Sequence, residues 1–147
     1  MYTLIVYAGW LGLFGTLAFA LWKGDMAERL GASLNFGLAI VGLLIHLVLP
    51  LSWRGIGLLA ADFALATGFL LLAMRYASIW LGVAMLFEAT QFALHGYYLV
   101  ADKRHDYTYG LVNNINTTAI QLAIVAGVAY AWRKRSRQRK ATLATSD

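Results

Sequence analysis

The polar side chains with the clearest chemical potential are Glu88, Gln91 and His95, in the otherwise apolar stretch FEATQFALHGYY at residues 87–98. Their spacing of i, i+3 and i+7 places all three within about 60° of one another around a helix. Glu and His can exchange protons under physiological conditions, and an ionised Glu can hold a cation. The stripe therefore has the chemistry of a proton or cation relay.

Four further polar residues lie at a matching depth on other apolar stretches. Counted at about 1.5 Å per residue, they lie about 10 to 15 Å from the nearest charged border. They are His46, Asp62, Asn113 and Asn116. We expect these side chains and the stripe to form one polar chamber that binds or passes a small ligand, a cation or a proton. The alternative role for the same groups is hydrogen bonding between membrane helices.

The histidines allow two cofactor hypotheses. His46 and His95 lie at similar depth on stretches that would run in the same direction, which suits axial ligation of a haem between them. His46, His95 and Asp62 are ligand types that suit a metal ion, with His105 as a further ligand from a loop. Their spacing matches no recognised metal motif. The chain has no cysteine, which excludes thiolate metal sites and iron–sulfur clusters.

The composition predicts membrane helices as the elements that position these groups. The chain of 147 residues is 61% hydrophobic and 13% charged, whereas soluble domains are about 25% charged. Because each stretch of about 20 apolar residues can cross a hydrocarbon core, and backbone groups in lipid must pair within the segment, these are expected to be helices. The expected spans are residues 4–22, 30–51, 55–74, 77–100 and 110–132.

The fold class predicted from these spans is all-α, a polytopic transmembrane helical bundle over residues 1–132. Four spans with one re-entrant segment are the alternative. The first span carries small residues at every fourth position, which lets membrane helices approach closely. These residues are Ala8, Gly12, Thr16 and Ala20.

The charges predict the orientation. The tail at residues 133–147, expected to be flexible, holds six of the 12 Lys and Arg, and the positive-inside rule places it in the cytoplasm. The N-terminus then lies outside, with nine basic residues inside and three outside. We expect the cell membrane, and specifically a bacterial inner membrane. The basic tail residues are also expected to bind anionic lipid headgroups: Arg133, Lys134, Arg135, Arg137, Arg139 and Lys140.

Two functions fit this pattern. The first is a small integral membrane protein with a polar chamber in its outer half. The second is a non-catalytic accessory or assembly subunit that docks with a membrane-protein partner or a second copy. An enzyme is the least supported class, because the sequence has no nucleophile–base motif, no HExxH and no Gly-rich phosphate loop. Nucleic-acid binding is not expected, since no folded domain surrounds the basic cluster.

Overall fold

The computed structural model describes residues 2–103 and 106–144, and the regular elements in these ranges are all helices. The predicted all-α class is confirmed. The five helices are α1 (Tyr2–Lys23), α2 (Met26–Val48), α3 (Leu51–Tyr76), α4 (Ile79–Val100) and α5 (Tyr107–Ala144).

The break between α2 and α3 is set by the chain's single proline, Pro50. A proline disfavours helical backbone at the residue before it, and Leu49 is extended, with φ −82° and ψ 140°. The expected span at 30–51 ran past this break. The next break has a different cause: Ala77 ends α3 in the left-handed conformation, with φ 46° and ψ 45°.

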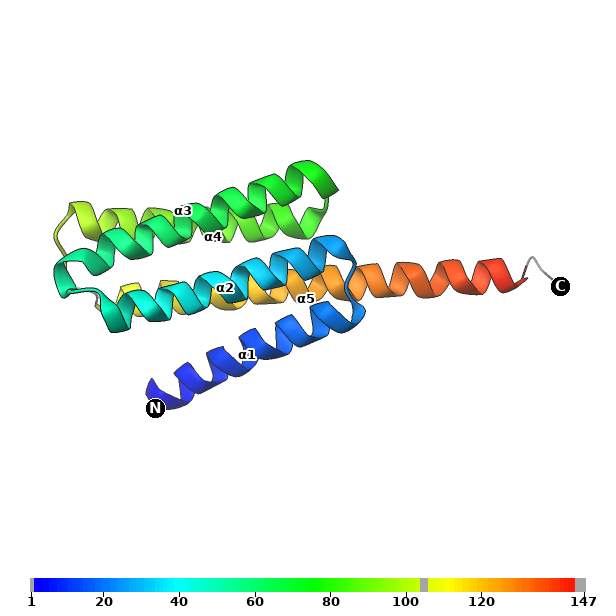
Figure 1. The fold of residues 1–147 in the computed structure, drawn as a ribbon, viewed down its shortest axis with the longest axis horizontal. Coiled ribbons are helices and arrows are strands. Elements are labelled where there is room, and N and C mark those ends of the chain that lie inside the picture. The colour runs from blue at the N-terminus through cyan, green and yellow to red at the C-terminus, as the bar shows by residue number, and fades with distance from the viewer. Residues whose placement is uncertain (1, 104–105, 145–147) are drawn as a thin grey trace.

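The helices form a closed ring in which each packs against the next and α5 returns to pack against α1 (Figure 1). Consecutive helices run in opposite directions. α5 also packs against α2, and α4 reaches α2 through the Trp80 side chain, which donates a hydrogen bond to Glu28. We call the end from which α5 protrudes the tail end, and the end with the turns at 49–50 and 101–103 the opposite end.

The stripe of small residues on α1 faces its neighbours over part of its length. Thr16 and Ala20 are buried, and a Cβ on Gly12 would lie 2.5 Å from Gln121 Oε1 of α5. Ala8, one turn earlier than Gly12, is exposed. The close approach of α1 and α5 therefore covers the part of the stripe nearer the tail end.

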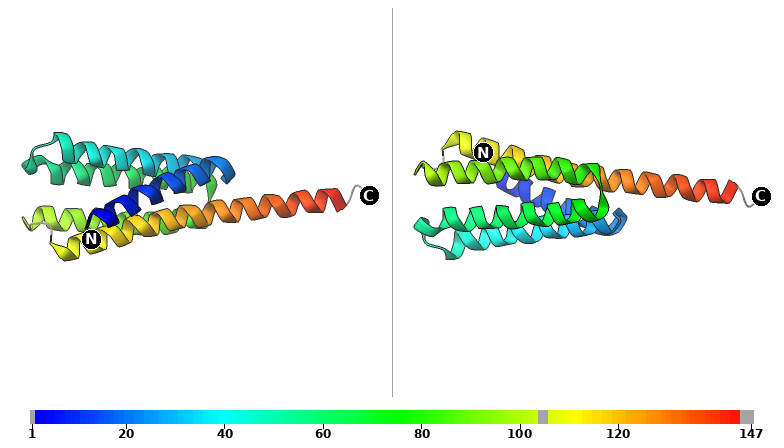
Figure 2. Two further views of the ribbon diagram at one scale, coloured as in Figure 1. Left: turned by 90° about the horizontal axis from the view of Figure 1, so that it is seen from below. Right: turned by 90° about the horizontal axis from the view of Figure 1, so that it is seen from above.

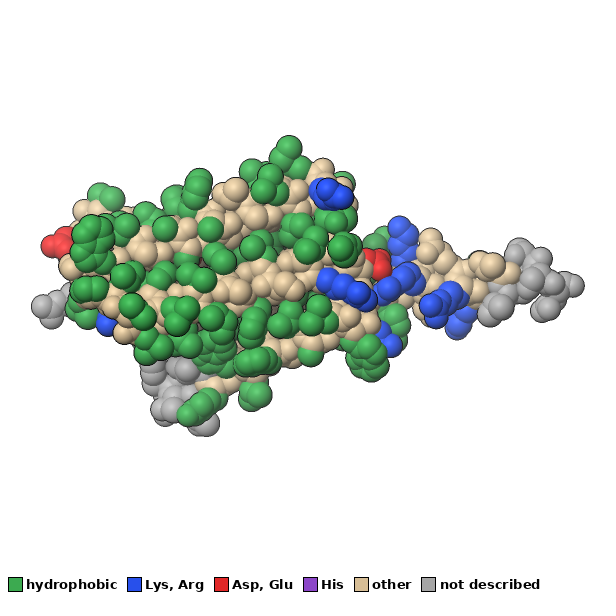
Figure 3. Space-filling view, in the orientation of Figure 1, with side chains coloured by type: hydrophobic (Ala, Val, Ile, Leu, Met, Phe, Trp, Pro, Cys, Tyr) green, Lys and Arg blue, Asp and Glu red, His purple; other side chains and the backbone are tan. Residues whose placement is uncertain are grey.

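Large apolar side chains cover the outside of the bundle (Figure 3). Soluble monomers rarely expose such extensive apolar surface, and lipid is the solvent that suits it. Three helices are long and apolar enough to cross a membrane: α2, α3 and α5 over Tyr107–Thr142. The polar stripe of α4 lowers the mean hydropathy of that helix, so α4 is not among these three. The fold is thus a helical bundle of membrane-protein character, and five spans remain a prediction.

The apolar core fills the half of the bundle nearer the tail end. Its most deeply buried members come from α1, α3, α4 and α5, and they include Ala20, Phe69, Leu81, Ala84, Ile124 and Val128. The buried polar side chains of α4, in contrast, begin at Glu88 and continue toward the opposite end. The two halves of the interior therefore differ in polarity.

The basic tail continues α5 and is not a separate segment. α5 runs through residues 133–144 without a break and extends alone beyond the other helices (Figure 2). The flexible tail expected from residue 133 is therefore helical up to Ala144, and residues 145–147 lie outside the described range. Arg, Lys, Gln, Ala and Leu are strong helix formers, and neither Gly nor Pro follows Gly127.

Candidate functional site

A cavity of about 130 Å³ lies at the centre of the bundle, and all five helices contribute to its walls. Its polar lining comes from Asn35 of α2, Asp62 of α3, Glu88 and Gln91 of α4, and Thr117 of α5. Its apolar lining consists of Leu13, Leu38, Ala39, Leu58, Ala61, Leu65 and Ile120, and Gly42 completes it. Two carboxylates therefore meet at one space inside an apolar bundle.

Glu88 is the residue of this cavity whose bonding is incomplete. Its side chain is 1% exposed, and Oε1 is the single buried side-chain nitrogen or oxygen without a hydrogen-bond partner among the described residues. A buried polar atom left unpaired is costly, and more so when it carries charge. Because Glu88 also lines the cavity, a small rotation of its carboxylate would let a bound molecule or ion satisfy this atom.

Asp62 is held in place by His95. The Nδ1 atom of His95 pairs with Oδ2 of Asp62, which joins α4 to α3. Asp62 lines the cavity and His95 supports it from behind. With a proton on Nδ1, the imidazole donates to the carboxylate whether the ring is neutral or charged. The pair fixes the orientation of the Asp62 carboxylate beside the cavity.

Gln91 joins α4 to α5 through both ends of its amide. Its Nε2 donates to Asn113 Oδ1, and its Oε1 accepts a hydrogen bond from Asn116 Nδ2 at 3.1 Å. These three side chains satisfy one another, as interhelical hydrogen bonds do in membrane bundles. These bonds link α4 to α5, and Gln91 also lines the cavity.

Aromatic rings cover His95 on the side of the opposite end. The His95 and Tyr109 ring centroids lie 5.4 Å apart, and the Tyr109 and Tyr98 centroids 5.0 Å apart. Asp106 Oδ1 accepts hydrogen bonds from the Tyr98 hydroxyl at 2.6 Å and from the Tyr109 N–H at 2.9 Å. These bonds hold the pKa of the Asp106 carboxyl below its usual range. This cluster separates the buried pair from the charged turn.

The structure does not bring His46 into this site. Its side chain is exposed on α2, and its Nδ1 lies 3.0 Å from the carbonyl oxygen of Gly42 on the same helix. A haem ligated by His46 and His95 would require His46 to turn inward and His95 to leave Asp62. The arrangement does not fit the expected haem or a metal site of His46, His95 and Asp62. No group of three or more His, Cys, Asp or Glu suitable for a metal occurs in the described ranges. His105, the further ligand considered, lies outside them.

No known protein family, curated protein or solved structure matches this chain. The chemistry of the cavity is therefore the ground for its functional assignment.

One buried carboxylate was missed by the sequence analysis. Glu28 accepts a hydrogen bond from the indole N–H of Trp80 at 2.9 Å through Oε1 and from the backbone N–H of Asp25 at 2.9 Å through Oε2. It precedes the expected span at 30–51, whereas α2 already begins at Met26. A Glu three residues after Asp25 is a helix-start signal that could have located it.

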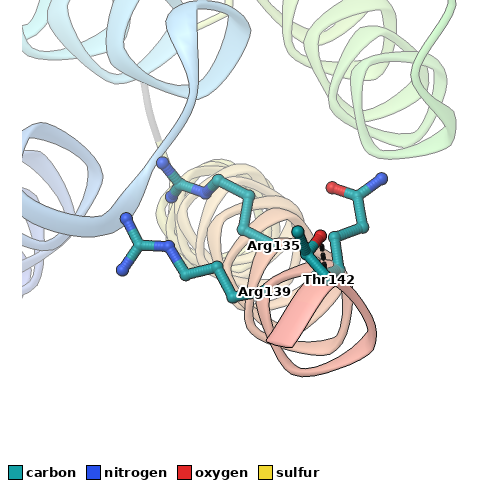
Figure 4. A pocket seen from close by; sticks show the side chains of 4 residues that line it. Arg135, Arg139 and Thr142 are labelled. Atoms are coloured by element: carbon teal, nitrogen blue, oxygen red, sulfur yellow. Dashed lines mark hydrogen bonds between the residues drawn. The ribbon is translucent and has the colours of Figure 1, made fainter. Parts of the chain in front are cut away.

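The basic residues of α5 form an open surface and not an enclosed site. Figure 4 shows the side chains of Arg135 and Arg139 leaving the same side of α5, next to Thr142. Arg135 is engaged within the molecule: its guanidinium lies 2.9 Å from Asp25 Oδ1 and donates to the Lys23 carbonyl. The other five residues expected at lipid headgroups are exposed: Arg133, Lys134, Arg137, Arg139 and Lys140.

Proposed function

We propose that this chain is an integral membrane protein of five spans whose central cavity binds a small polar ligand, a cation or a proton within the bilayer. The observation that carries the proposal is Glu88, whose side chain lines the cavity and whose buried Oε1 has no hydrogen-bond partner among the described residues. Ionisable residues inside a membrane bundle are rare, costly and characteristic of ligand, ion or proton sites.

The basic residues support an orientation with the tail end in the cytoplasm and the N-terminus outside. Nine Lys and Arg then lie inside and three outside. A bacterial inner membrane is the location we propose, with the cavity in the outer half of the bilayer. The exposed basic side chains of α5 would contact anionic headgroups there, at roughly 1 kcal/mol for each residue near the surface.

Binding is a better description of this cavity than passage. Between the cavity and the tail end, the interior is packed with Phe69, Leu81, Ala84 and Ile124. The buried polar groups in this half, such as Glu28 with both carboxylate oxygens hydrogen-bonded, form no continuous polar path from the cavity. Passage to the other side would therefore need helix movement or a second copy of the chain.

Single cysteines test whether water and small solutes reach the cavity, because the chain has no native cysteine. Thr117→Cys would place a thiol on the cavity wall, and Thr118→Cys would place one on the exposed, apolar outer surface. Thiols react as thiolates, which need water to form. We expect a small water-soluble methanethiosulfonate reagent to modify Thr117→Cys at least tenfold faster than Thr118→Cys. Equal or slower modification of Thr117→Cys would contradict a water-accessible chamber.

The second candidate function is an accessory or assembly subunit of a larger membrane complex. The observation that favours it is α5, which extends beyond the bundle and offers an exposed charged helix to a partner. In this case the Gln91, Asn113 and Asn116 bonds serve packing alone. Purification in mild detergent from native membranes should then retain a partner in fixed ratio, and Arg137→Glu with Arg139→Glu should release it. If the native protein and the double variant both purify without a partner, the result argues against this function.

A further inference from the structure

We propose that the ligand of the central cavity is a small monovalent cation, an alkali or ammonium ion, coordinated by Glu88 and by the oxygens around it. This inference rests on the proposed function and names its ligand class. It starts from the one buried oxygen that lacks a partner in the described chain, Glu88 Oε1.

The lining of the cavity selects for positive charge. Glu88 and Asp62 are its charged residues, and no Lys or Arg occurs among the described residues that line it. Asn35 and Thr117 add an amide and a hydroxyl oxygen from α2 and α5. Oxygen ligands suit hard cations, and two carboxylates within an apolar bundle would repel an anion.

The charge balance favours one positive charge over two. Asp62 already has a charge-assisted partner in His95, so Glu88 is the carboxylate that, when ionised, has no compensating charge among the described residues. A divalent ion such as Ca²⁺ takes six to eight oxygens, commonly from several carboxylates. The described residues hold no cluster of three or more acidic or His side chains. One monovalent ion would neutralise Glu88 and leave the Asp62–His95 pair intact.

The size of the cavity suits a small ion. About 130 Å³ corresponds to roughly four water molecules at about 30 Å³ each. That space holds an alkali ion with part of its hydration shell, or an ammonium ion with its hydrogen bonds to oxygen. Choline serves as the control cation, because the methyl groups on its nitrogen keep oxygen ligands at a distance and leave it no N–H to donate.

Thermal unfolding of the full-length protein in detergent provides the first test. NaCl, KCl and NH4Cl are compared with choline chloride at equal ionic strength, so that general screening of charge is constant. An ion that binds the folded state alone raises the Tm with its concentration, and we expect a rise of at least about 3 °C near saturation. The ranking of the three salts distinguishes an alkali site from an ammonium site.

Two carboxylate variants show whether the response belongs to the cavity. Glu88→Gln keeps the size of the side chain and removes its charge, and we expect it to abolish the rise in Tm. Glu28→Gln changes the other deeply buried Glu, which lies outside the cavity. Whatever the Tm of this variant without added cation, we expect the cation to raise it as in the native protein. A response that survives in Glu88→Gln, or that is absent from the native protein, would overturn the cation site. If Glu88→Gln does not fold, Asn35→Leu removes a different cavity oxygen and serves as the same test.

Modification of Thr117→Cys separates failure of this inference from failure of the proposed function. Matched methanethiosulfonate reagents carrying an ammonium or a sulfonate group are used. We expect the ammonium reagent to react at least tenfold faster, and saturating salt of the preferred cation to slow it. Equal rates for both reagents, with no slowing by the salt, would show that the chamber is accessible but would contradict the proposed cation site. A thiol at position 117 that reacts with neither reagent would contradict the water-accessible chamber, and therefore the proposed function.

Discussion

Glu28 and Glu88 are both buried Glu side chains, and their surroundings give them opposite roles. Both oxygens of Glu28 accept hydrogen bonds, from Trp80 and from the backbone of Asp25. Oε1 of Glu88 accepts none from the described residues, and the Glu88 side chain lines a cavity. A fully bonded buried carboxylate orders the structure around it, whereas an incompletely bonded one can take a ligand. The difference lies in the partners, since the two residues are chemically identical.

The role assigned to Glu28 predicts the effect of removing its indole partner. Trp80→Phe keeps an aromatic ring but leaves Glu28 Oε1 buried without a donor, which should lower the free energy of unfolding by about 1–3 kcal/mol. Trp53→Phe is the control, because Trp53 is exposed, and it should change stability little. Unfolding in mixed detergent micelles, followed by circular dichroism, measures both. Equal losses in the two variants would show that the bond to Glu28 is unimportant.

At the scale of the helices, Trp80 determines how α2, α4 and α5 approach one another. A Cβ on Gly31 of α2 would lie 2.6 Å from the ring of Trp80, and a Cβ on Gly127 of α5 would lie 2.5 Å from it. The indole of α4 thus fills a gap that exists because two neighbouring helices carry glycine at this level. Small residues of this kind allow close packing between membrane helices.

This packing predicts opposite effects for two glycines of α2. Gly31→Ala forces a methyl group against the rigid indole, so it should lower the free energy of unfolding by about 1–3 kcal/mol. Gly37→Ala meets nothing within 4 Å, so it should leave stability unchanged or raise it by up to about 1 kcal/mol through helix propensity. The same micelle titration compares them. A Gly31→Ala protein as stable as Gly37→Ala would contradict the close contact with Trp80.

The whole molecule combines an apolar outer surface with a polar cavity and a charged helical extension. Exposed Leu, Ile, Phe and Trp side chains surround the bundle, and the basic residues gather at the tail end and along α5 (Figure 3). In water this arrangement would leave a large apolar surface unsatisfied. In a bilayer, lipid covers that surface, and the basic extension remains with the headgroups and the aqueous phase.

The orientation of the whole molecule predicts where its two ends lie. With five spans, a reporter fused after Asp147 should be cytoplasmic, and one inserted after Asp102 should be external, because the turn at 101–103 is at the opposite end. Paired alkaline phosphatase and green fluorescent protein fusions measure this, since the first is active outside and the second fluoresces inside. Both positions on the same side would contradict five spans, and a reversed pair would contradict the orientation.

The sequence by itself was sufficient for the helical class, the approximate positions of the five helices and the polar stripe on α4. These features are local: apolar stretches of about 20 residues form helices in lipid, and the spacing along one helix determines which side chains share a face. The predicted positions of the helix ends were less accurate where a local sequence signal was not used. Pro50 ended α2 earlier than the expected span, and the good helix formers after Trp132 continued α5 to Ala144.

The tertiary structure decided which of the polar residues meet. Depth along a helix could be counted from the sequence, and it grouped His46 with Asp62 and His95. Depth does not define the rotation of a helix about its axis or its neighbours, because these depend on how side chains from all five helices pack together. That packing leaves His46 on the surface, pairs Asp62 with His95, and joins Glu28 to a Trp80 that is 52 residues away. It also places Glu88, whose Oε1 has no partner among the described residues, on the lining of a cavity built by all five helices.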